Sequence, residues 1–368
     1  MNHLLSVPRL LASLVLVACS GMFAPAAIAQ PAGAQGENFL YRVIKDDTLI
    51  MLSERFTDST ERWRTLQTLN TIDDPTRLPI GLELKIPFAL IPEQAAQAQV
   101  VHVTGTAYRG RQKLAVGDQL AEGDTISTGA NGFATLSLPD GTTLTVPAQS
   151  SLRLERLRVF KGTGLTDTIS TLNDGSLESQ VAPQGTGVGR FEIRSPVSIT
   201  GVRGTQLRVH VNQQGSQSEV LEGVAGLNSQ QAESTRLRQG QGAAVNSSGE
   251  LQAVRSLLPA PALPTPERAD SGWQLSFPAV PGARSYLVRV AGDPQGTKLF
   301  SSQLFDTPNI SFRAPGAGTY YVMVRGIDAE GLNGADAIQP FLGSAVLKVS
   351  DGGPVSTPFG LFVTLTDY

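Results

Sequence analysis

The chain has 368 residues, of which 40% are hydrophobic, 6% aromatic and 17% charged, and its formal net charge is −3. This length allows two or three domains, each with its own core. No basic stripe interleaved with aromatic residues occurs, which argues against nucleic acid as a partner. Beyond the N-terminus, no apolar run approaches the roughly 20 residues that a membrane-spanning helix needs. We therefore expect no transmembrane helix in the mature chain.

Residues 1–29 have the pattern of a secretory signal peptide, because Arg9 precedes an apolar run over residues 10–18. Two processing routes are open. Ala27-Ile-Ala29 is an A-x-A cleavage site, and we favour cleavage there, which gives a periplasmic protein. Leu16-Val-Ala-Cys19 resembles a lipoprotein signal, in which Cys19 would carry a lipid anchor to a membrane. Cys19 is the only cysteine, so no disulfide can staple the exported chain.

Residues 38–90 predict two short strands that enclose two helices. Apolar residues alternate near both ends of the segment, as in strands with one buried face. Between them, apolar residues recur at helical spacing behind Thr48, a candidate N-cap, and a second amphipathic segment follows. The residues that give this pattern are Tyr41, Val43, Leu49, Leu52, Phe56, Trp63, Leu66, Leu69 or Asn70, Leu82, Leu84 and Ile86. The expected order is βααβ.

The two ends, Tyr41-Arg-Val-Ile-Lys-Asp-Asp-Thr-Leu49 and Leu78-Pro-Ile-Gly-Leu-Glu-Leu-Lys-Ile-Pro87, resemble the LysM family. This resemblance implies binding of peptidoglycan or a related N-acetylglucosamine glycan in a shallow groove between two loops. The candidate glycan-binding residues at the matching positions are Asp47, Thr48, Leu49, Leu78, Pro79, Ile80 and Gly81. Asp46 stands where the family usually has Gly, and a positive φ there would be costly. A LysM-like fold without glycan affinity is the alternative.

Residues 98–255 predict an all-β domain, because strands of four to six residues alternate with Gly-Asp and Asp-Gly turns. A β-sandwich and a β-helical stack both fit. Ser195-Pro-Val-Ser-Ile-Thr-Gly-Val-Arg-Gly-Thr205 and the Leu114–Gly129 segment resemble the FecR domain. The resemblance implies an exported module that recognises an envelope protein partner. Sigma-factor regulation does not carry over, because the chain lacks the membrane helix and cytoplasmic part of FecR itself.

Within this motif we expect a turn marked by Gly201, Arg203, Gly204 and Thr205. Glycine allows backbone angles that are closed to other residues, and the Arg203 guanidinium can donate to nearby carbonyls. We therefore interpret these residues as structural. A partner-binding role for Arg203 is the alternative.

Residues 256–268 are rich in proline and predict a semi-rigid spacer between two domains. Residues 269–368 alternate with period two and resemble a fibronectin type III-like sandwich, in which Trp273, Tyr286 and Tyr321 would fill the core. A sugar platform is the alternative role for Trp273. The tail, with residues 345–349 and 359–365, predicts a last strand or an apolar segment that docks elsewhere.

Catalytic, cofactor and metal sites are not expected. His102 and His210 are the only histidines after the signal segment, and valines flank both, as on a strand surface. Residues 185–189 lack the Gly-Lys-Ser/Thr of a phosphate loop. The acid pairs at 46–47 and 73–74 are interpreted as charged turns.

These observations favour a non-enzymatic exported envelope protein that binds peptidoglycan and presents its other modules to a protein partner. The alternative is a periplasmic signal-sensing component of a transmembrane signalling system, in which the LysM-like module serves only for localisation. A cell-wall hydrolase is a third and weaker hypothesis.

Overall fold

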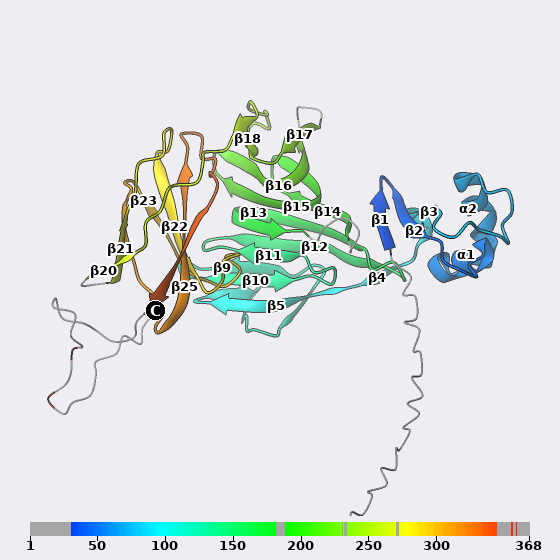
Figure 1. Cartoon of the computed structure of the whole chain (residues 1–368), viewed down its shortest axis with the longest axis horizontal. Coiled ribbons are helices and arrows are strands. Elements are labelled where there is room, and N and C mark those ends of the chain that lie inside the picture. The colour runs from blue at the N-terminus through cyan, green and yellow to red at the C-terminus, as the bar shows by residue number, and fades with distance from the viewer. Residues whose placement is uncertain are drawn as a thin grey trace, which may run out of the picture.

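The computed structural model describes residues 31–181, 188–229, 231, 234–269, 272–343, 355 and 358. The expectation of a mainly β protein with one small α/β region is confirmed. Three parts follow one another along the long axis (Figure 1). The N-terminal α/β module lies at one end, a large sheet occupies the middle, and a β-sandwich lies at the other end.

The N-terminal module contains the predicted βααβ order and one strand that the sequence did not predict. It comprises β1 (Pro31–Gln35), β2 (Asn38–Arg42), α1 (Leu49–Thr57), a 3-10 turn (Thr60–Arg62), α2 (Trp63–Asn70) and β3 (Glu83–Pro87). Strand β2 pairs antiparallel with β1 and with β3. The Oγ1 of Thr48 accepts a hydrogen bond from the backbone N–H of Met51 at 3.3 Å, so Thr48 is the N-cap of α1.

The core of this module continues into the middle sheet. Phe39, Tyr41 and Phe56 pack their rings at centroid distances between 5.1 and 6.4 Å. Phe160, which the middle sheet contributes, stacks on Phe88 at 4.5 Å and is buried with the same cluster. The N-terminal module is therefore docked on the sheet through shared apolar contacts.

The middle region forms one 16-stranded sheet whose hydrogen-bonded path runs from β19 to β8. Among the described residues, its strand pairs are antiparallel except β13 with β14, and most of its buried apolar residues form one large cluster. The strands are β4 (Glu93–Ala95), β5 (Gln97–Thr104), β6 (Ala107–Arg109), β7 (Gln112–Lys113), β8 (Gln119–Ala121), β9 (Thr125–Thr128), β10 (Phe133–Ser137), β11 (Thr143–Val146), β12 (Ser151–Phe160), β13 (Thr166–Gln180), β14 (Val188–Arg194), β15 (Ser198–Asn212), β16 (Gly215–Ser229), β17 (Thr235–Arg238), β18 (Gln241–Asn246) and β19 (Arg255–Ser256).

Strand β13 connects the two ends of the molecule. Leu165, immediately before it, is buried in the core of the N-terminal module. Near its other end, Glu178 binds two arginines of the C-terminal module. Gly175 interrupts the strand with φ +84°, and a Cβ there would lie 2.4 Å from the carbonyl oxygen of Gln149, so only glycine fits.

The C-terminal module is a sandwich of two antiparallel sheets. The first sheet contains β20 (Glu267–Ala269), β21 (Gly272–Ser276) and β24 (Asn309–Phe312). The second contains β22 (Ser285–Ala291), β23 (Leu299–Phe305), β25 (Gly318–Ile327) and β26 (Ala337–Gly343), in the order β23-β22-β25-β26. A shared apolar cluster fills the space between the two sheets.

The predicted aromatic core of this sandwich is partly confirmed. Trp273 and Tyr286 are buried at 6% and 3% exposure. Tyr321 is only half-buried, and its neighbour Tyr320 packs against the core instead. The guanidinium of Arg268 lies 4.2 Å from the centre of the Trp273 ring, so this ring does not offer a free face to a sugar.

The proline-rich segment does not hold its neighbours apart. Leu257 donates its N–H to the carbonyl of Gly240 at 2.8 Å, and the carbonyl of Leu258 accepts from Ala335 at 2.9 Å. The segment thus lies along both flanking domains, which contact each other directly. The segment expected to be a spacer instead packs on both domains. Its hydrogen-bond partners, Gly240 and Ala335, are distant in the sequence, so the local sequence does not reveal them.

Among the described residues, no helix is long and apolar enough to cross a membrane. The predicted signal peptide with Cys19, residues 185–187 and the apolar stretches 345–349 and 359–365 lie outside the described residues.

Candidate functional site

The two loops predicted to hold a glycan lie side by side at one end of the β2–β3 pair. The backbone of Val43 bonds to both Gly81 and Leu82, at 2.8 and 2.9 Å. The N–H of Leu49 donates to the carbonyl of Pro75 at 3.0 Å. The sequence-predicted residues from both loops are therefore brought together by backbone hydrogen bonds.

The side chains of the first loop serve mainly to hold the fold. The Oδ2 of Asp47 accepts from the hydroxyl of Tyr41 at 2.9 Å and from the N–H of Ile44 at 2.8 Å. Burial and the bond to Asp47 raise the pKa of Tyr41 to about 12. Thr48 is occupied as the helix cap, and the side chain of Leu49 is fully buried. Any contact of Leu49 with a glycan would involve its backbone.

The second loop is more accessible. Ile80 is 72% exposed, Pro79 and Gly81 are exposed, and Leu78 is half-buried. Gly81 has φ +87°, a conformation that favours glycine. The loop therefore presents an apolar side chain and backbone groups to solvent, which suits the CH faces and hydroxyls of a sugar.

Two further apolar residues at this end were missed by the sequence interpretation. Ile50 and Met51, in the first turn of α1, are 44% and 57% exposed. Leu49, Leu52 and Phe56 define the buried face of this helix, so positions 50 and 51 fall on the opposite face. This periodicity was the signal that could have identified them.

Asp46 adopts the left-handed conformation, with φ +71°. The loop thus keeps the backbone shape for which a glycine is suited, although a side chain is present. Asp tolerates this region better than most residues. Asp46 in place of glycine therefore makes this backbone conformation less favourable, but the loop keeps the same path.

The expected turn at Gly201–Thr205 is wrong. These residues lie inside β15, where Gly201 pairs with Glu192 and Gly226. Gly201 is not among the positive-φ glycines, and the irregularities in the pairing of β15 with β16 fall between Arg203 and Leu207. Arg203 therefore lies in a strand, and its side chain is outside the described part of the chain.

A buried ionic cluster joins the middle sheet to the C-terminal sandwich. Glu178 accepts from Arg289 at 2.8 Å and from Arg325 at 2.5 Å. Arg208 donates to Asp336 at 2.5 Å and lies 3.4 Å from Glu219. The three arginine side chains are between 2% and 5% exposed. Sequence analysis did not identify this cluster, in which directly bonded partners such as Glu178 and Arg325 lie 147 residues apart along the chain.

Charge balance determines the protonation of the cluster. Burial opposes ionisation of Glu178, but the guanidiniums of Arg289, Arg325 and Arg208 outweigh it and hold the pKa of Glu178 well below its usual range. Burial raises the pKa of Glu219, although Arg208 opposes this shift. The ion pairs fix the sandwich against the sheet.

The two histidines are not simple surface residues. The Nε2 of His102 lies 2.9 Å from the carbonyl oxygen of Leu299, and the ring meets Phe300 edge-on at 5.7 Å. His102 thus belongs to the contact between sheet and sandwich. The Nδ1 of His210 lies 2.7 Å from the hydroxyl of Ser176, and burial lowers the pKa of His210.

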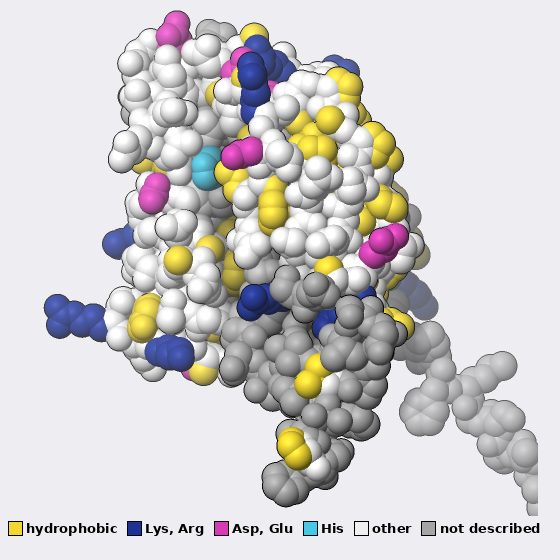
Figure 2. Space-filling model, turned by 90° about the vertical axis from the view of Figure 1, so that its left-hand side faces the viewer, with side chains coloured by type: hydrophobic (Ala, Val, Ile, Leu, Met, Phe, Trp, Pro, Cys, Tyr) yellow, Lys and Arg dark blue, Asp and Glu magenta, His cyan; other side chains and the backbone are white. Residues whose placement is uncertain are grey.

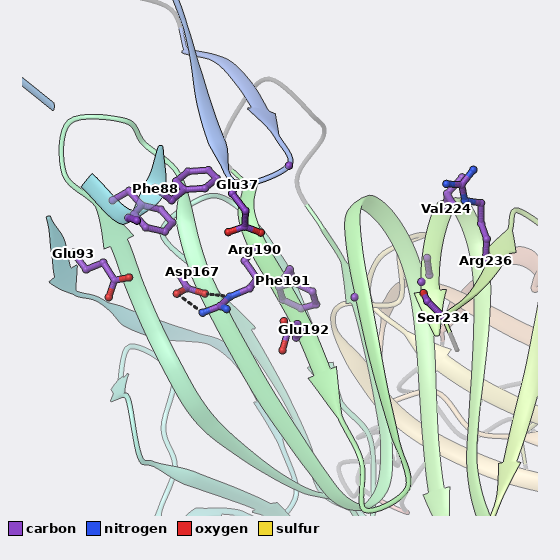
Figure 3. A pocket seen from close by; sticks show the side chains of 16 residues that line it. Glu37, Phe88, Glu93, Asp167, Arg190, Phe191, Glu192, Val224, Ser234 and Arg236 are labelled. Atoms are coloured by element: carbon purple, nitrogen blue, oxygen red, sulfur yellow. Dashed lines mark hydrogen bonds and ion pairs between the residues drawn. The ribbon is translucent and has the colours of Figure 1, made fainter. Parts of the chain in front are cut away.

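A cleft of about 820 Å³ lies beside the contact between the N-terminal module and the sheet (Figure 3). Glu37 and Phe88 line one side of it, and Asp167 and Arg190 line the other. Asp167 accepts from Arg190 at 2.6 and 2.7 Å and from Arg156 at 2.5 Å. Because this central carboxylate is already paired with two guanidiniums, we assign no ligand to the cleft.

Fold and site together define a modular, mainly β protein whose N-terminal module displays a two-loop apolar surface. The family model for the LysM domain matches residues 41–87, and the model for FecR protein matches residues 124–226. The LysM match indicates glycan binding, and both domains are typical of envelope proteins. No curated protein matches the chain significantly.

Two similar solved structures are both of a "putative anti-sigma factor from Parabacteroides distasonis ATCC 8503". Each is 19% identical to this chain, with TM-scores of 0.30 and 0.29. Each match covers 36% of this chain and 59% of the other. The chain thus spans less than two thirds of the length of these proteins.

Proposed function

We propose that this chain is a non-enzymatic envelope protein that binds peptidoglycan through residues 41–87. In this proposal the FecR-like sheet and the C-terminal sandwich are presented to an envelope protein partner. The export signal predicted from residues 1–29 would deliver the chain to the periplasm. The order of the two sheets, β20-β21-β24 and β23-β22-β25-β26, supports a fibronectin type III-like interpretation of the sandwich.

The observation that carries the glycan role is the exposed apolar surface on the paired loops. Ile80 is 72% exposed and Met51 is 57% exposed, and neither side chain belongs to the apolar core of the module. Glycan rings place CH groups on such surfaces while backbone amides bind their hydroxyls. A single module of this size would bind weakly, so the effect should be measured on insoluble, multivalent peptidoglycan.

A pelleting assay with purified peptidoglycan tests this role. The wild-type chain should sediment with the polymer, and Ile80→Asp should lower the apparent affinity by at least about tenfold, since it places a charge where an apolar contact is expected. Val116→Asp is the matched control, because Val116 is 64% exposed in the turn between β7 and β8, away from the N-terminal module. Equal sedimentation of Ile80→Asp and Val116→Asp would contradict the proposed surface.

A second candidate function is a signalling component whose FecR-like domain senses a partner while the LysM module only localises it. The FecR match over residues 124–226 favours it. Removing the LysM module is a poor test, because Phe160 and Leu165 would lose their cover. The Ile80→Asp chain is better: partner capture should persist after glycan binding is lost. Loss of both together would argue against this candidate.

A further inference from the structure

The edge strand β23 of the four-stranded sheet lacks the usual protection. Its sequence, Leu299-Phe-Ser-Ser-Gln-Leu-Phe305, contains no charge and no proline. The opposite edge, β26, contains Pro340. Within the described ranges, β23 pairs only with β22. A strand edge with free backbone groups and neutral side chains readily accepts another strand.

A cleft of about 830 Å³ opens beside this edge. Residues 300–303 of β23 line it, and the loops 104–106 and 130–131 of the middle sheet form its far side. Among the described residues, its lining contains hydroxyls, amides, three phenylalanines and Arg313, and no carboxylate. On the face of the molecule at the sandwich end, uncharged side chains and backbone make up most of the described surface that is visible (Figure 2). The surroundings of β23 therefore suit an uncharged polypeptide segment.

The chain itself contains a segment of this kind. Phe359-Gly-Leu-Phe-Val-Thr-Leu365 has seven uncharged residues rich in aromatic and β-branched types, which favour strands. Residues 350–358, Ser-Asp-Gly-Gly-Pro-Val-Ser-Thr-Pro, contain the turn and linker residues that would let the chain reverse direction.

The register of the sheet shows that the chain leaves β26 at the end of the sheet where β23 begins. Gly343, where β26 ends, pairs with Gly318, while Ala291 pairs with both Tyr321 and Leu299. The end of β26 and the start of β23 thus lie at the same end of the sheet. Three strand spacings separate them, about 14 Å. The 16 residue steps from Gly343 to Phe359 can span about 50 Å.

We propose that residues 359–365 add to the free edge of β23 as a fifth strand and fill the cleft beside it. Backbone groups of β23 gain hydrogen-bond partners, and the phenylalanines lining the cleft gain apolar neighbours. The chain thereby covers an edge that would otherwise invite pairing between molecules. This inference is independent of glycan binding.

Hydrogen exchange of the β23 amides tests the proposal. In a chain that ends at Gly343, amides of residues 301–305 should exchange at least about tenfold faster than in the full chain. The exchange rates of the β22 amides should be the same in both chains, which would show that the sandwich remains folded. A synthetic peptide of residues 357–368, added to the shortened chain, should restore the protection. Unchanged exchange of residues 301–305 after the truncation would overturn the proposal.

A point variant separates strand addition from other effects of the tail. Val363→Pro in the full chain should reproduce the loss of protection, because proline removes a ladder donor. Val355→Pro, in the linker, should not. Protection that increases with protein concentration together with dimer formation would assign β23 to a second copy. Protection by a soluble N-acetylglucosamine oligomer but not by the peptide would assign the cleft to a sugar. Either result would overturn the proposal.

Discussion

Replacing Glu178 by Gln should detach the sandwich from the middle sheet more than any exposed substitution. The carboxylate accepts from Arg289 and Arg325, and Arg208 lies 4.0 Å away. Without its charge, three guanidiniums that are at most 5% exposed share the negative charges of Asp336 and Glu219. Glutamine has nearly the same shape as glutamate, but it no longer neutralises the charges of the neighbouring arginines.

The magnitude follows from the burial of the cluster. Removing one partner of a buried ion pair costs about 3–5 kcal/mol, because the remaining charge is left uncompensated. Glu178 itself is 19% exposed, so solvent screens part of the loss, and we expect a value near the lower limit, about 3 kcal/mol. For a unit of 150–250 residues this lowers Tm by about 6–12 °C.

Calorimetry and urea denaturation of the full chain measure this change. Glu83→Gln is the matched control, because the Arg42–Glu83 pair is 60% and 51% exposed at its two side chains. Such an exposed pair contributes about 0–1 kcal/mol. If Glu178→Gln costs no more than Glu83→Gln, the cluster does not join the two domains in the manner described.

Three further outcomes are expected. Burial opposes ionisation of Glu178 and Asp336, but neighbouring guanidiniums hold both pKa values below the usual range. The stability that these two ionised carboxylates contribute is complete above their unfolded pKa, near 4, and is lost as the pH falls below it. Glu219 partly offsets this loss, because burial raises its pKa. Tm should therefore fall below about pH 4, and a Tm that rises there would contradict this. Asp46→Gly should stabilise by at most about 1 kcal/mol in urea denaturation, because it relieves a positive φ, and a clear loss would refute the strain. Phe160→Ala should cost about 3–5 kcal/mol and speed hydrogen exchange in the N-terminal module; unchanged exchange there would show that the shared core is unimportant.

Local patterns allowed much of the fold to be predicted. The helical spacing behind Thr48 gave α1 and its cap, and the alternation around Trp273 and Tyr286 gave two buried aromatics. These predictions succeed because each pattern, and the element that it predicts, lie within the same short stretch of sequence. The paired loops at 46–49 and 78–81 also followed from recognisable end segments.

Long-range partners explain what the sequence did not reveal. Arg208 and Asp336 lie 128 positions apart, and neither residue type indicates a buried partner. His102 alternates with valines, as a residue on the solvent face of a strand would. In the structure, this face of the strand contacts the C-terminal sandwich instead of solvent. Gly201 looked like part of a turn because of its neighbours, whereas pairing on both sides places it in a strand of 15 residues. Tertiary pairing overrode the local preference.

Strand β13 sets the distance between the N-terminal module and the C-terminal sandwich. Thirteen residues separate Leu165, in the N-terminal core, from Glu178, in the ionic cluster. At about 3.3 Å per residue these two anchoring points lie about 40 Å apart along the strand. A protein that holds a glycan at one end would therefore sample partners within a shell of defined depth above the polymer. If the proposed glycan binding holds, the chain would select its partner both by the partner's distance from the polymer and by the chemistry of its surface.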